Sequence, residues 1–155
     1  MTKPVKLELI IEGMEMQFED SRTFLNKITG EIISVTSEDL RAAEDDEPFE
    51  HLPEWQQEER EVALDVIDNF ENYVELPTNY DINEYEIMED FCLDVRERGR
   101  RDTLLGVIKG RGAFRRFKDR IIEFGIETEW YSFRDKRFKE IAIEWCQDNK
   151  IMFVE

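Results

Sequence analysis

The first apolar segment of the chain has helical spacing. Within residues 6–16, the apolar side chains recur as they would along one face of a helix, at Leu7, Ile10, Ile11 and Met14. The run 7–11 would also suit a strand, and the longer spacing favours the helix. We therefore expect a short amphipathic helix over residues 6–16.

Two short apolar runs after this helix predict a β-hairpin. Residues 23–25 and 31–35 flank a turn that ends at Gly30, which can take the positive φ that closes a hairpin. Residues 73–77 alternate apolar and polar side chains, and Pro77 ends this run. Because an isolated hairpin is marginally stable, we expect residues 73–77 to add a third antiparallel strand.

Capping residues and apolar stripes predict helices between and after these strands. Thr36 or Ser37 can cap one helix, and Pro53 begins the next. Asp81 and Glu84 have capping-box spacing and open a third. The faces expected to be buried carry Trp55, Val62, Ala63, Val66, Ile67 and Phe70 in the second helix, and Met88, Phe91, Cys92 and Val95 in the third.

Two glycines delimit a helix in the C-terminal part. After a short helix over residues 101–109, Gly112 begins a helix that Gly125 ends, and a last helix over residues 128–149 completes a C-terminal helical hairpin. The expected buried faces carry Ala113, Phe114, Phe117, Ile121 and Phe124, and then Trp130, Phe133, Phe138, Ile141, Ala142 and Trp145. The predicted fold is α+β and mostly helical, with a small three-stranded antiparallel sheet packed with helices.

The length and composition are those of one folded domain. The chain has 155 residues, of which 41% are apolar, and we expect a single domain over residues 1–155. No apolar run is long enough to cross a bilayer, and residues 1–4 lack the pattern of a secretory signal. Cys92 and Cys146 lie in apolar helical patterns, so we expect reduced core thiols in a cytoplasmic protein without membrane contact.

Charge is distributed unevenly along the chain, whose formal net charge is -17. Residues 1–95 hold 6 basic and 27 acidic residues, whereas residues 96–155 hold 15 and 11. Within residues 96–120 alone there are 10 basic and 3 acidic residues. The pattern predicts an acidic N-terminal body, 1–95, and a basic helical C-terminal part, 96–155, which meet either in an internal electrostatic clasp or as two distinct binding surfaces.

The basic residues are densest at the start of the helix after Gly112. Arg111, Arg115 and Lys118 are spaced to form one line along that helix, which we call the basic ridge. The free N–H groups of the first helical turn would lie beside it. Together they predict an anion-binding or partner-binding site for phosphate or carboxylate groups.

Arg116 and Tyr131 complete the candidate site. Arg116 lies towards the other edge of the helix, and Tyr131 lies off the apolar face of the last helix, where it could be exposed near the ridge. The alternative interpretation is structural: the glycines set helix boundaries, the phenylalanines are core, and the arginines cover apolar edges and pair with the protein's own acids.

Catalytic and metal-binding patterns are absent from the sequence. His51 is the single histidine, so no Ser-His-Asp or Cys-His arrangement forms without it. The two cysteines have no metal-ligand spacing, and the glycines of residues 106–112 match no phosphate-binding fingerprint. We expect no cofactor, no metal ion and no enzymatic activity.

Several motifs resemble one known family. They are 110–119 (GRGAFRRFKD), 129–135 (EWYSFRD) and 140–146 (EIAIEWC), with further likeness in 52–56, 74–77 and 86–91. In this order the chain resembles the uncharacterised bacterial protein family numbered 0158 in the UPF series. The resemblance implies a small cytosolic bacterial protein of one domain and supplies no functional residues.

The leading functional hypothesis is a non-enzymatic regulatory or adaptor module that binds a protein partner through its basic helical face. A nucleic-acid-binding protein that holds phosphates on the basic ridge is the first alternative. An acidic mimic of nucleic acid, which occupies a partner's basic groove, is the second. The sequence leaves the partner and the oligomeric state open.

Overall fold

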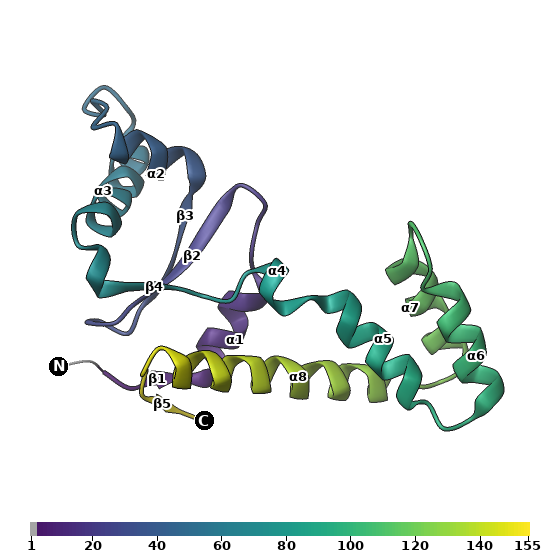
Figure 1. Cartoon of the computed structure of the whole chain (residues 1–155). Helices are drawn as coiled ribbons and strands as arrows, with labels where there is room; N and C mark the ends of the chain where they lie inside the picture. Colours follow the sequence, from purple (N-terminus) through teal and green to yellow (C-terminus); the bar gives the residue numbers. More distant parts are fainter. Residues whose placement is uncertain (1–2) are drawn as a thin grey trace. The chain divides into compact units, whose positions relative to one another are not determined.

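A computed structural model describes residues 3–155. Met1 and Thr2, part of the segment inspected above for a secretory signal, lie outside the described residues. The chain divides into two compact units, which are described separately. The sheet unit comprises the chain up to Asn79 with Ala142–Glu155, and the helical unit comprises Tyr80–Ile141 (Figure 1). The single domain expected from the length stays a prediction.

The sheet unit contains the predicted three-stranded antiparallel sheet. Its strands are β2 (Ser21–Asn26), β3 (Ile32–Thr36) and β4 (Tyr73–Glu75), in the order β3-β2-β4. The hairpin between β2 and β3 closes at Gly30, whose φ of 79° lies in the left-handed region that glycine tolerates. The α+β prediction and the third strand are thereby confirmed.

Helices cover both faces of this sheet. On one face, α2 (Ser37–Glu44) and α3 (Glu54–Asp68) close a core of Phe24, Val35, Leu40, Ala43, Ala63, Val66 and Tyr73. On the other face lies α1 (Leu7–Glu15), where a Cβ added to Gly13 would meet Leu76 Cδ2 at 2.6 Å and Ile32 Cγ2 at 3.2 Å. The predicted N-cap is also present, since the Thr36 hydroxyl accepts the Asp39 N–H at 3.0 Å.

Three apolar residues of the sheet unit are more exposed than the sequence predicts. Trp55, Val62 and Phe70 are 59%, 39% and 70% exposed, although helical spacing predicts a buried face for all three. Trp55 lies in the first turn of α3, and Phe70 lies beyond its end in the 3₁₀ helix η1 (Phe70–Asn72), so neither shares the packed stretch around Ala63 and Val66.

A parallel strand pair joins the two ends of the described chain. It consists of β1 (Val5–Lys6) and β5 (Phe153–Val154), and the Val5 N–H donates to Met152 O at 2.9 Å. Two-residue strands are too short for an alternating pattern, so periodicity does not predict this pair.

The helical unit is built from consecutive helices around aromatic side chains. After α4 (Asn79–Ile82) come α5 (Glu84–Asp94), α6 (Arg98–Val107), α7 (Ala113–Glu123) and α8 (Glu127–Asp148), of which the part up to Ile141 belongs to this unit. Phe91 contacts Phe117, Trp130 and Phe133 with ring centroids 6.0, 5.4 and 5.5 Å away. Phe117 of α7 meets Trp130 of α8 at 4.9 Å. These edge-on contacts hold the helices together.

Three details of the helical unit correct the sequence-based assignment. Asn83, in the left-handed conformation, caps α5 in place of Asp81, and its Oδ1 accepts the Glu86 N–H. Glu97 caps α6, which therefore begins three residues before the predicted start. Phe114 is 38% exposed, so it lies at the margin of the α7 core face.

Candidate functional site

The start of α7 presents free backbone donors. Gly112 is the N-cap with a φ of 76°, and no side chain caps the helix. No capping side chain therefore accepts a hydrogen bond from the first N–H groups of α7. Because Gly112 is left-handed, Arg111 lies outside the helix, and the helical spacing predicted for the basic ridge holds only for Arg115 and Lys118.

Arg116 has a structural role that the sequence did not reveal. Its guanidinium donates to Val107 O at 2.8 Å, to Lys109 O at 2.6 Å and to Arg111 O at 2.5 Å. All three acceptors belong to the end of α6 and the turn before α7. Arg116 thus satisfies the carbonyl of the last residue of α6 and fixes the turn that carries Arg111. Its guanidinium is therefore occupied inside the helical unit and is not available to a partner.

The basic ridge is exposed and unpaired within the helical unit. Arg111, Arg115 and Lys118 are all exposed, and none of them forms an ion pair or side-chain hydrogen bond there. Other arginines of this unit are paired: Arg100 with Glu97 at 3.7 Å, Arg120 with Glu123 at 2.6 Å, Arg134 with Glu84 at 2.5 Å and Arg137 with Asp90 at 2.8 Å. The acidic residues of the helical unit therefore do not neutralise the three cations of the basic ridge.

Tyr131 and Glu97 lie in the same unit. Tyr131 is 44% exposed on α8, and no hydrogen bond or cation–π contact connects its side chain with the basic ridge. The Glu97 carboxylate accepts the N–H groups of Gly99 and Arg100, which lowers its pKa. Glu97 therefore serves as a cap of α6. Of the predicted site residues, Arg111, Gly112, Arg115, Arg116 and Lys118 share the segment at the start of α7, and Tyr131 lies on α8.

The sheet unit holds a groove that sequence reasoning missed. It has a volume of about 570 Å³ and lies between α1 and the β2–β3 hairpin, with Leu9, Met16 and Phe18 among its apolar walls. These three side chains are 42%, 65% and 67% exposed. Phe18 follows the end of α1, outside any periodic stretch, so no spacing rule marked it.

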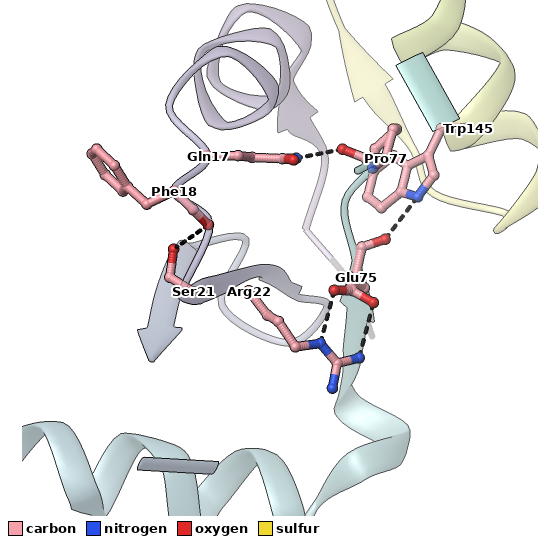
Figure 2. A network of polar contacts seen from close by, with 7 residues as sticks. All are labelled: Gln17, Phe18, Ser21, Arg22, Glu75, Pro77 and Trp145. Carbon is pink, nitrogen blue, oxygen red and sulfur yellow. Dashed lines mark hydrogen bonds and ion pairs between the residues drawn. The ribbon is translucent and has the colours of Figure 1, made fainter. Parts of the chain in front are cut away.

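The outer edge of β4 is occupied. The Trp145 indole donates to Glu75 O at 3.0 Å, and Arg22 holds the Glu75 carboxylate through two bonds of 2.9 Å (Figure 2). In the same network Gln17 donates to Pro77 O. The outward backbone carbonyl of Glu75 at the β4 edge is therefore bonded by a side chain of this chain itself.

Other candidate chemistry is not assembled in residues 3–155. Cys92 and Cys146 are buried free thiols, and burial raises their pKa values to about 12 and about 11. His51 is exposed. Across the described residues, no group of three histidine, cysteine or carboxylate side chains could hold a metal ion. None of the helices there combines the length and the apolar character that a bilayer span requires.

Comparison with known proteins decides the family. The chain matches the uncharacterised protein family UPF0158 over residues 2–155. It belongs to the UPF0158 family. A UPF0158 protein of Pseudomonas aeruginosa is 32% identical over 66 residues, a segment that covers 42% of this chain and 43% of that relative. No solved structure matches.

Membership of UPF0158 confirms the resemblance found in the sequence and adds no site residues. The candidate site of this UPF0158 protein therefore rests on its own geometry. The missed residues were recognisable only in three dimensions, because the groove depends on the α1–hairpin packing and the Arg116 anchor depends on the turn between α6 and α7.

Proposed function

We propose that the chain is a non-enzymatic adaptor that binds an acidic segment of a partner protein on the basic ridge. The observation that carries the proposal is that Arg111, Arg115 and Lys118 are exposed without an ion pair in their unit, while neighbouring arginines are bonded internally. A cation without an internal partner is available to an external carboxylate.

The surroundings of the ridge support this role. Arg116 holds the turn that carries Arg111, so that part of the ridge is ordered before a partner binds, which reduces the entropy lost on binding. The uncapped N–H groups of α7 lie in the same segment and favour an anionic group.

The buried reduced thiols fit the cytoplasmic location proposed for the protein.

A titration with a defined probe tests this function. Fluorescence anisotropy of labelled hexaglutamate should report saturable binding to the wild-type chain. The triple variant Arg111→Glu, Arg115→Glu, Lys118→Glu should bind about tenfold more weakly. Three exposed ion pairs of about 0.5 kcal/mol each contribute about 1.5 kcal/mol, and a tenfold change in affinity corresponds to about 1.4 kcal/mol. Equal binding by both proteins would contradict the proposal.

A charge-matched control separates the ridge from net charge. The variant Lys3→Glu, Lys6→Glu, Lys136→Glu has the same net charge, and all three lysines are exposed. It should bind hexaglutamate nearly as tightly as the wild type. A heptathymidylate probe tests the nucleic-acid alternative: tighter binding of that probe, with a steep dependence on salt, would assign the ridge to phosphate backbones instead.

A further inference from the structure

The outer edge of β3 is an unpaired sheet edge. In the β2–β3 ladder, Asn26 N–H donates to Glu31 O and Ser37 N–H donates to Asp20 O, both at 2.8 Å. Since the direction of the backbone groups alternates along an antiparallel strand, the N–H and C=O groups of Ile32 and Ser34 point away from β2.

The two edges of the sheet differ in a way that leaves β3 open. At β4, the outward carbonyl of Glu75 is bonded by the Trp145 indole (Figure 2). At β3, Ser34 is exposed and Ile32 is half-buried, and no side chain of residues 3–155 is bonded to the outward groups of either residue. An open edge of this kind can accept an additional strand.

Recesses lie on both sides of this edge. The 570 Å³ groove opens on the α1 side and is lined by Ile32 and Ser34 together with Leu9 and Met16. A second recess of about 270 Å³ opens on the α2–α3 side. The side chains of an added strand alternate between the two faces of a sheet, so they would enter the two recesses in turn.

The chemistry of the recesses defines the occupant. The exposed apolar walls of the first recess favour apolar side chains in the bound segment. The second recess is lined by Val62 and by the carboxylates of Asp39 and Glu59. Asp39 forms an ion pair with Arg60 at 3.2 Å, whereas Glu59 forms no ion pair with the described residues of the sheet unit. Glu12 and Glu31 add two exposed carboxylates to the first recess. This complementarity favours lysine or arginine over acidic side chains.

We propose that β3 binds an extended peptide segment of a partner protein by strand addition, with apolar side chains in the α1 groove and basic side chains towards Glu59. β3 spans five residues, so the bound segment extends over about 16 Å, or about five residues. This surface lies in the sheet unit and does not depend on the basic ridge, so the two proposals stand or fall separately.

The test uses a peptide that carries this pattern. Labelled Lys-Leu-Lys-Val-Lys, blocked at both ends, should bind the full-length chain at physiological ionic strength in an anisotropy titration. N-methylation of the amides that face β3 should abolish binding, whereas N-methylation of the other amides should preserve it. Because the two methylated peptides carry the same charge, non-specific attraction to an acidic surface predicts equal binding of both and would overturn the proposal.

A backbone variant tests the same edge from the protein side. Ser34→Pro removes an N–H that points away from β2, so the β2–β3 ladder is retained, and peptide binding should weaken about tenfold. Ser34→Thr keeps the N–H and should bind as the wild type does. If Ser34→Pro does not fold, Met16→Glu, which places a charge in the groove, should give a comparable loss.

Three results would contradict strand addition at β3. The first is unchanged peptide binding by a folded Ser34→Pro or Met16→Glu variant. The second is equal binding of Glu-Leu-Glu-Val-Glu. The third is a concentration-dependent dimer in light scattering that disappears in Ser34→Pro, which would assign the edge to a second copy of the chain.

Discussion

The two units use their charged residues differently. The sheet unit holds 7 basic and 24 acidic residues, and its three arginines, Arg22, Arg41 and Arg60, are all in ion pairs. The helical unit holds 14 of each sign, yet the basic ridge is unpaired. The whole net charge of -17 thus belongs to the sheet unit. Pairing is decided by local geometry, and the charge of the chain does not indicate which cations are available.

The largest effect should come from an arginine that is bonded inside the sheet unit. Arg60 is 8% exposed and pairs with Asp39, so Arg60→Ala leaves a carboxylate with little compensation. We expect the free energy of unfolding to fall by about 3 kcal/mol. Urea denaturation measures this, and Arg111→Ala in the helical unit is the comparison, with an expected change below about 0.5 kcal/mol. Equal effects would remove the distinction between bonded and free arginines.

Two adjacent arginines of α7 give the sharpest comparison within one unit. Arg116→Ala leaves the carbonyls of Val107, Lys109 and Arg111 without their donor and should cost about 2 kcal/mol. Arg115→Ala removes the same charge from the same helix and should change stability by less than about 0.5 kcal/mol. Thermal unfolding of the two variants measures the difference. A lower melting temperature for Arg115→Ala than for Arg116→Ala would contradict the structural role of Arg116.

Helix capping provides a smaller test of the difference between the units. Thr36 caps α2 of the sheet unit, and Thr36→Ala should cost about 1 kcal/mol. α7 of the helical unit has no capping side chain to lose. If Thr36→Ala left the unfolding midpoint unchanged in urea, while Thr36→Ser also had no effect, the cap would have no energetic role.

The smallest effect concerns the thiols, one in each unit. Burial raises the pKa of Cys92 to about 12 and that of Cys146 to about 11, so above about pH 8.5 the unfolded chain loses these protons before the folded chain does. Stability should therefore fall as the pH rises towards 11, by less than about 1 kcal/mol per thiol at pH 9. Urea denaturation at pH 7 and pH 9 measures this fall in the free energy of unfolding. The fall should be smaller in the double variant Cys92→Ala, Cys146→Ala.

The sequence predicted what depends on local pattern. Helical spacing located α1 and α8, Gly30 and the alternating runs located the sheet, and Thr36 was one of two candidates for the cap of α2. Periodicity cannot show how far a packed stretch extends, so Trp55 was assigned to a core that α3 does not form there.

The candidate site was predicted only in part, because its residues depend on packing as well as on local pattern. The sequence identifies the basic residues of the ridge, but it cannot distinguish an arginine that is bonded internally from an adjacent arginine that is free. Arg116 differs from Arg115 only because the turn before α7 brings three carbonyls within its reach. The open edge of β3 likewise depends on the strand order and on Trp145, which is 70 residues from Glu75 in the sequence.

The most direct test of the central claim is the NMR spectrum of the arginine Nε–H groups, recorded during a titration with hexaglutamate. The structure predicts slow solvent exchange for Arg116, whose Nε–H is bonded to Val107 O, and fast exchange for Arg111 and Arg115. Hexaglutamate should shift the signals of Arg111 and Arg115 and leave that of Arg116 in place. Protected signals for Arg111 and Arg115 in the free protein, or a shift confined to Arg116, would contradict the account.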